Sequence, residues 1–129
     1  MANEDGVARL CQAANSKSGN EIWNSWRKKH DNARIDLRGA DLAGLVFNDN
    51  TSYVDLDLSN VDLSDANFSS AQLESVSFEN SNLQHANFST TKLETISFNR
   101  SDLCSAIFDS STMASRVLFR YAEMRAASC

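Results

Sequence analysis

The sequence predicts an all-β solenoid: a chain wound into square coils that stack along one axis, with a helical cap at each end. Three observations lead to this fold class. Large apolar residues recur every five positions through the middle of the chain, a period that fits neither a helix nor a strand. The pattern repeats after twenty residues, and segments of helical spacing flank it on both sides. A chain of 129 residues with 42% hydrophobic content is long enough for one core and one domain.

The five-residue period is unbroken from Leu58 to Met113, with a leucine, phenylalanine or methionine at every fifth position. A small or β-branched residue stands two positions before each of these markers, except for the bulky Leu56. The other three positions of each five are mostly polar. Two of every five side chains therefore point inward, as in a chain that turns at every fifth residue. Four fives close one coil, and strand pairing spaces the coils about 4.8 Å apart.

Stacking the coils arranges the markers into four inward-facing columns. Residues 71–90 and 91–110 match at eight of twenty positions, which supports the twenty-residue step. Before Leu58 the period slips, and one extra residue within "NDNTS" (48–52) brings Tyr53 into line. We therefore expect sixteen fives in about four coils, forming a rod roughly 20 Å long. The columns are Leu37, Leu58, Phe78 and Phe98; Leu42, Leu63, Leu83 and Leu103; Phe47, Phe68, Phe88 and Phe108; and Tyr53, Leu73, Leu93 and Met113.

Both ends of the solenoid are predicted to be helical, because a stack of coils otherwise exposes unpaired strand edges. Residues 6–14 and 20–30 carry apolar side chains at helical spacing, with Asn20 as a plausible N-cap. At the other end, residues 112–125 place Val117, Leu118, Tyr121 and Met124 on one helical face. An alternative for this segment is a docking helix that exposes Phe119. The single domain then divides into an N-terminal helical cap (1–34), the repeat (35–113) and a C-terminal helical cap (114–129).

The motifs "ADLAG" (40–44), "VDLSD" (61–65), "ANFSS" (66–70) and "ANFST" (86–90) resemble the A(D/N)LXX motif of the pentapeptide repeat proteins. The resemblance covers residues 35–115, and segment 22–42 is similar to the lead-in of bacterial, notably cyanobacterial, members. It implies a right-handed quadrilateral β-helix. Gyrase-protecting members dimerise through their C-terminal ends, but a helix over that end predicts a monomer for this chain.

Charge is distributed unevenly along the chain. Residues 35–113 hold twelve acidic and three basic side chains, whereas residues 1–34 hold six bases and four acids, and residues 114–129 three bases and one acid. A rigid acidic rod with flat outer walls suits a non-enzymatic module that docks a protein partner, because a patterned negative field steers basic partners. The partner itself is unidentified. The candidate interaction surface is Asp55, Asp57, Asp62 and Asp65.

Two alternatives belong to other functional classes. The acidic rod could mimic a DNA duplex and bind a DNA-handling enzyme such as gyrase, as the resemblance suggests. Alternatively, Asp65, His85 and Ser105 share one outward column and contain the residue types of a hydrolase triad. The sequence implies no pocket and no oxyanion donor beside them, so we expect no enzyme and no catalytic residues.

Other kinds of site are not expected from the sequence. His30 and His85 are far apart, no cysteine or histidine pair has ligand spacing, and we predict neither a metal nor a cofactor. Glu74 and Glu94 are expected to stack as solvated like charges. The basic run Arg27–Lys29 lies in a net acidic chain, which argues against direct nucleic-acid binding. Without a signal peptide or a long apolar run, we expect a cytoplasmic chain that avoids membranes. Its cysteines would be reduced thiols: Cys11, Cys104 and Cys129.

Overall fold

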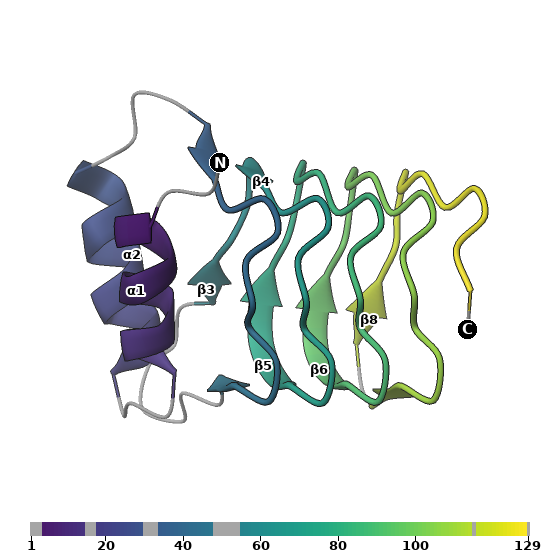
Figure 1. The fold of residues 1–129 in the computed structure, drawn as a ribbon, viewed down its shortest axis with the longest axis horizontal. Coiled ribbons are helices and arrows are strands. Elements are labelled where there is room, and N and C mark those ends of the chain that lie inside the picture. Colours follow the sequence, from purple (N-terminus) through teal and green to yellow (C-terminus); the bar gives the residue numbers. More distant parts are fainter. Residues whose placement is uncertain (1–3, 15–17, 30–33, 48–54, 115, 129) are drawn as a thin grey trace.

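The computed structural model describes residues 4–14, 18–29, 34–47, 55–114 and 116–128 of the chain. It is a β-solenoid with two helices, α1 (Glu4–Ala13) and α2 (Gly19–Lys29), stacked against one end (Figure 1). The predicted β-solenoid is confirmed, and so are the two N-terminal helices. The C-terminus lies at the opposite end of the stack from the helices.

Short parallel strands mark the walls of the solenoid, because the chain advances by one coil between paired segments. β1 pairs with β4, while β5 pairs with β2 and β3 and, on its other side, with β6, which also pairs with β7 and β8. The strands are β1 (Ile35–Asp36), β2 (Val46–Phe47), β3 (Leu56–Asp57), β4 (Val61–Asp62), β5 (Gln72–Ser77), β6 (Lys92–Ser97), β7 (Thr112–Met113) and β8 (Val117–Leu118).

The twenty-residue step is confirmed from Leu56 onward, since Leu56 pairs with Val76 and Val76 with Ile96. A third turn then leads from Ile96 to Val117, so three turns can be followed through this part of the chain. The coil count therefore differs slightly from the predicted four. The preceding turn passes through residues 48–54, which lie outside the described residues, and so does the predicted column member Tyr53.

The predicted register of the first coil is wrong. Ile35 pairs with Val61 and Phe47 with Leu73, a step of 26 residues rather than the predicted 21. The chain between β2 and β3 thus contains five more residues than predicted. Because five residues are one full period, the same residues still point inward, but each marker of the first coil moves to the next wall. The members moved in this way are Leu37, now in the column of Leu63; Leu42, now in that of Phe68; and Phe47, now in that of Leu73. Leucine and phenylalanine fill inward positions equally well, so the sequence pattern alone does not distinguish these walls.

The core consists of stacked columns of apolar side chains, and fourteen of the sixteen predicted column residues are buried. Phe68, Phe88 and Phe108 form one ladder, with ring centroids 4.9 and 5.0 Å apart. A second ladder includes Phe78 and Phe98, at 5.2 Å, and meets the first edge to face. Both arrangements are favourable for aromatic rings. Met113 is an exception to the burial prediction: it is 40% exposed at the open end of its column.

The predicted C-terminal helix is wrong, because the chain continues as another coil after Met113. Val117 pairs with Ile96, while Glu123 and Ser128 form bridges to Asp102 and Ile107. One extra residue between β7 and β8 shifts the register by one. Phe119 therefore takes the inward position and stacks on Phe98 at 5.2 Å, whereas Leu118 turns outward and is 51% exposed. The alternative of a docking helix with an exposed Phe119 is wrong for the same reason.

The corners of the coils turn without proline by combining two local devices. From Leu58 to Phe108, the residue two positions after each marker adopts a positive φ, for example 60° at Asp65 and 58° at Asn80. Where the residue before the marker is Asp, Asn or Ser, its side chain accepts a hydrogen bond from the backbone N–H two positions later, as Asp62 does from Ser64 (3.1 Å). Asp, Asn and Ser, which are abundant in these positions, favour both conformations.

Replacing Thr95 with glycine is expected to raise the free energy of unfolding by about 0.5–1 kcal/mol. Thr95 has a φ of 54°, a strained conformation for a β-branched residue, whereas Gly39 occupies the same corner position with a φ of 69°. Relief of this strain exceeds the entropy that glycine adds to the unfolded chain. Denaturant unfolding measures the difference, and a variant less stable than the wild type would contradict this account of the corners.

The N-terminal helices close one end of the solenoid by satisfying its strand edge. Trp23 is fully buried, and its Nε1 donates a hydrogen bond to the backbone oxygen of Asp57 at 2.6 Å. The Asn24 side chain accepts from the Asp57 N–H and donates to the Asp55 carbonyl oxygen, both at 2.9 Å. Arg27 donates to the same Asp57 oxygen at 3.0 Å. Helix α2 therefore supplies, through side chains, the partners that a preceding coil would supply through its backbone.

Candidate functional site

One wall of the solenoid carries a column of mostly acidic side chains. Register pairs join Asp36 to Asp62, Asp62 to Asn82, Asn82 to Asp102 and Asp102 to Glu123. Neighbours in such a column lie about 4.8 Å apart along the solenoid axis. We call Asp36, Asp62, Asn82, Asp102 and Glu123 the acidic column. Four of its five members carry a carboxylate, and it extends from the first coil to the last.

Local hydrogen bonds hold two of these carboxylates in the ionised form. The Arg38 guanidinium donates to both carboxylate oxygens of Asp36, at 2.9 and 2.7 Å, and this lowers the pKa of Asp36 to about 2. Burial acts to raise the pKa of Asp102, but hydrogen bonds from Cys104 and Gln84 and the charge of Arg125 lower it overall. The column is therefore negatively charged at neutral pH.

The stability of the chain is expected to fall as the pH drops from 3.8 to about 2. In that range an unfolded Asp36 carboxyl takes up a proton, while the folded one, with its pKa lowered to about 2, does not. Stability from the pair with Arg38 is thus fully present above pH 3.8 and is lost toward pH 2. Thermal melts across this range should show a smaller loss for Arg38→Gln than for the wild type or for Arg100→Gln. Equal losses in all three proteins would contradict the prediction.

The four residues of the predicted interaction surface do not share one wall. Asp55 and Asp57 lie beside α2, and Arg27 forms an ion pair with Asp57 at 3.6 Å. Asp62 belongs to the acidic column, and Asp65 is exposed at the following corner. Asp57 therefore contributes to the attachment of the cap, which leaves Asp62 and Asp65 as the residues open to a partner on this part of the surface.

Asp65, His85 and Ser105 lie at corresponding corners of successive coils, as their twenty-residue spacing predicts. All three have a φ near 60°, and Asp65 and His85 are exposed. Within the described part of the chain, no hydrogen bond or ion pair links their side chains. The corners stack through the backbone instead: the Asp65 N–H donates to Gln84 and the His85 N–H to Cys104. The stacking is thus explained by corner geometry, without any catalytic contact.

Comparison with known proteins identifies the repeat. Residues 33–108, more than half of the chain, match the family model described as pentapeptide repeat region. The chain belongs to the pentapeptide repeat family. No curated protein matches it significantly.

Three solved pentapeptide repeat proteins are similar to this one in structure. One, from the Arabidopsis thaliana thylakoid lumen, is 26% identical, with a TM-score of 0.43; the alignment covers 67% of this chain and 59% of that one. A second, from the cyanobacterium Cyanothece, is 23% identical, with a TM-score of 0.44 and coverages of 76% and 67%. A third, involved in heterocyst differentiation regulation in the cyanobacterium Nostoc, is 21% identical, with a TM-score of 0.33 and coverages of 74% and 45%. The chain thus spans about three fifths of the length of the Arabidopsis protein.

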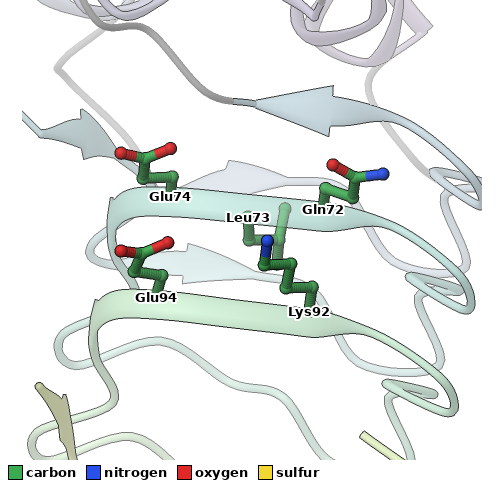
Figure 2. A pocket seen from close by; sticks show the side chains of 5 residues that line it. All are labelled: Gln72, Leu73, Glu74, Lys92 and Glu94. Carbon is green, nitrogen blue, oxygen red and sulfur yellow. The ribbon is translucent and has the colours of Figure 1, made fainter. Parts of the chain in front are cut away.

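A shallow hollow of about 80 Å³ lies on the wall of the pentapeptide repeat formed by β5 and β6. Its lining includes Glu74 and Glu94, which are register partners on the two strands, together with Lys92. Figure 2 shows the two carboxylates one above the other at the same end of their strands, with Lys92 toward the other end. The predicted stacking of like charges is present, and the half-buried carboxylates face a hollow too small for an organic ligand.

The described residues form no group of three or more metal-ligating side chains that could hold an ion. Cys11 and Cys104 are free thiols, and Cys129 lies outside the described residues. Partial burial raises the pKa of the Cys11 thiol, and the charge of Asp41 raises it further. Among the helices described here, none is long and apolar enough to cross a membrane.

The open end of the pentapeptide repeat is a surface that the sequence reasoning missed. Its last coil exposes several large apolar side chains, and its arginines are also exposed. The signal was present in the sequence, because the five-residue period resumes at Phe119 and Met124 with Val117 and Ala122 two positions earlier. The exposed apolar side chains are Met113 (40%), Leu118 (51%), Tyr121 (76%) and Met124 (36%).

Proposed function

We propose that this pentapeptide repeat protein is a non-enzymatic interaction module that docks a basic segment of a partner protein along its acidic column. The observation that carries the proposal is the succession of register pairs from Asp36 to Glu123, which aligns carboxylates along one wall. Like charges at this spacing repel one another, and a row of lysine or arginine side chains relieves that repulsion.

The backbone ladder makes the column suitable for recognition. Backbone hydrogen bonds between coils fix the spacing of the side chains, as in the Asn82 N–H to Val61 oxygen bond at 3.0 Å. A partner therefore meets charges already in place, so little conformational entropy is lost on binding. Because Arg38 already pairs with Asp36, the carboxylates left to a partner are those of the half-buried Asp62 and Asp102 and of the exposed Glu123. The expected partner segment is extended and carries basic side chains that step along the solenoid axis.

The double substitution Asp62→Asn with Asp102→Asn tests this proposal. Asparagine already occupies the equivalent position at Asn67, Asn82 and Asn87 and accepts the same corner hydrogen bond. The variant should thus lose charge without losing its fold. The matched control is Asp41→Asn with Asp109→Asn, which removes two charges away from the column.

The probe is a synthetic octapeptide of alternating arginine and serine, with affinity measured by calorimetry at low and physiological salt. Since one exposed charge pair contributes about 0.2–1 kcal/mol, the column variant should weaken binding about fivefold and the control less than about twofold. Partners recovered from a lysate of the native organism should likewise be depleted with the column variant only. Equal losses with both double variants would show that net charge, rather than the column, attracts the probe.

A second candidate is mimicry of a DNA duplex toward an enzyme such as gyrase. The net charge of residues 35–113 favours it, because twelve acids against three bases give a strongly negative rod. On this hypothesis the protein alters DNA supercoiling by gyrase, and the Asp62→Asn, Asp102→Asn variant loses the effect. No change in supercoiling at high protein concentration would remove this candidate while leaving the basic-peptide result intact.

A further inference from the structure

The open end of the solenoid presents backbone groups that are paired in every coil below it. The N–H groups of Phe98 and Arg100 donate to the carbonyl oxygens of Leu118 and Arg120, both at 2.8 Å. One coil later, the corresponding N–H groups belong to Phe119 and Tyr121. Neither has an acceptor within the described residues. Such an unpaired edge is a template for another strand.

Apolar surface accompanies this backbone edge. Phe119 stacks on Phe98 with one face, and no further ring covers its other face within the described chain. Leu118, next to it on β8, is 51% exposed. The apolar core therefore reaches the surface along β8 and the residues directly after it, which offer the unpaired N–H groups. An added segment would gain both hydrogen bonds and apolar contact there.

The strand edge is covered at one end of the solenoid and uncovered at the other. At the N-terminal end, α2 covers the edge of β3 and supplies side-chain partners to the backbone of Asp55 and Asp57. Figure 1 shows the helices at that end alone, while the last coil lies at the other. Head-to-tail stacking of identical copies is thus blocked by the helices.

The charge around β8 indicates what kind of segment fits. Arg116 directly precedes this strand and Arg120 follows its last residue by two positions, and both are exposed. Arg125 lies further along the same coil, where Glu123 is the one acidic residue among residues 116–128. Two copies joined through this end would bring six arginines together, a repulsive arrangement. An acidic segment instead neutralises the arginines.

We propose that this end binds an extended acidic segment of a partner protein, which pairs with β8 as an added strand. An apolar side chain of the segment, next to its second acidic residue, covers Phe119. Its acidic residues lie about four positions apart, since Arg116 and Arg120 are separated by roughly 13 Å of extended chain. Strand addition of this kind uses main-chain hydrogen bonds for affinity and side chains for specificity. The acidic column meets this coil only at Glu123 and makes no use of the edge at Phe119 and Tyr121, so this proposal does not depend on the function proposed above.

The experiment is an NMR titration of the ¹⁵N-labelled chain with the synthetic peptide Glu-Val-Thr-Phe-Glu, acetylated and amidated. Binding should slow hydrogen exchange at the Phe119 and Tyr121 amides. Arg116→Gln with Arg120→Gln should weaken binding at least about tenfold, whereas the corresponding lysine variants retain most of it. The control is Lys28→Gln with Lys29→Gln, which removes the same charge at the capped end and should leave the affinity unchanged.

Three outcomes would overturn the proposal. No binding of the peptide would mean that the arginines merely keep the edge from pairing. Equal binding of the same peptide with glutamine in place of glutamate would show that charge does not select the segment. If sedimentation shows a dimer of the free chain, with Phe119 already protected, the occupant is a second copy rather than an acidic segment.

Discussion

Replacing Phe88 with alanine is expected to lower the free energy of unfolding by about 3–5 kcal/mol. Phe88 is fully buried, and its ring lies between those of Phe68 and Phe108 at 4.9 and 5.0 Å. It also meets the edges of Phe78 and Phe98. The substitution thus leaves a cavity where both ladders meet, and each coil of a solenoid relies on its neighbours. Urea unfolding followed by circular dichroism measures the loss.

The matched control is Phe88→Leu, which should cost less than about 1.5 kcal/mol. Leucine already fills the corresponding inward position of the same coil at Leu83, also fully buried. The comparison separates loss of volume from loss of aromatic character. A cost below about 1 kcal/mol for the alanine variant would contradict a core built from these stacked rings.

Replacing Trp23 with alanine is expected to cost a similar amount, about 3–5 kcal/mol, and to uncover a strand edge as well. Trp23 is fully buried, stacks on Trp26 at 5.0 Å and donates to the Asp57 backbone oxygen. Its loss should loosen α2 from β3, so the variant should also self-associate. Denaturant unfolding and sedimentation measure the two effects.

Two controls on the same helix make this result specific. Trp23→Phe keeps most of the apolar contact but removes the indole donor, so an intermediate cost of about 1–3 kcal/mol is expected. Ile22 is 39% exposed, and Ile22→Ala should cost less than about 1 kcal/mol. A monomeric Trp23→Ala variant with near wild-type stability would mean that α2 does not close the end of the solenoid.

Much of the architecture follows from the sequence because two inward side chains in every five leave a clear signature. From Leu58 to Phe108 the columns, their burial and the twenty-residue step all follow from that pattern. The register of the first coil was not predicted because five extra residues, one full period, leave the inward positions unchanged. Leu37 packs on Leu63 as well as it would on Leu58. The pattern fixes which residues point inward, whereas strand pairing decides the wall on which they lie.

The position of the acidic column depends on how the first coil pairs with the second. The predicted step places Asp36 beside Asp57, which pairs with Arg27. The observed step places Asp36 beside Asp62 instead and so creates the acidic column. At the other end, Val117, Leu118 and Tyr121 have helical spacing, but stacking of Phe119 on Phe98 favours a further coil. Local spacing was ambiguous there, and a long-range aromatic contact decided the conformation.

Amide hydrogen exchange of the 129-residue chain tests most directly the central claim that the solenoid continues to Ser128 and leaves the Phe119 and Tyr121 N–H groups of that coil unpaired. The N–H groups of Glu123 and Ser128 donate to Ser101 and Ala106, both at 3.0 Å, so they should exchange slowly. Those of Phe119 and Tyr121, on the open side of the same coil, should exchange rapidly. A continuous run of protected amides from residue 117 to 125 would instead indicate a helix and contradict the account.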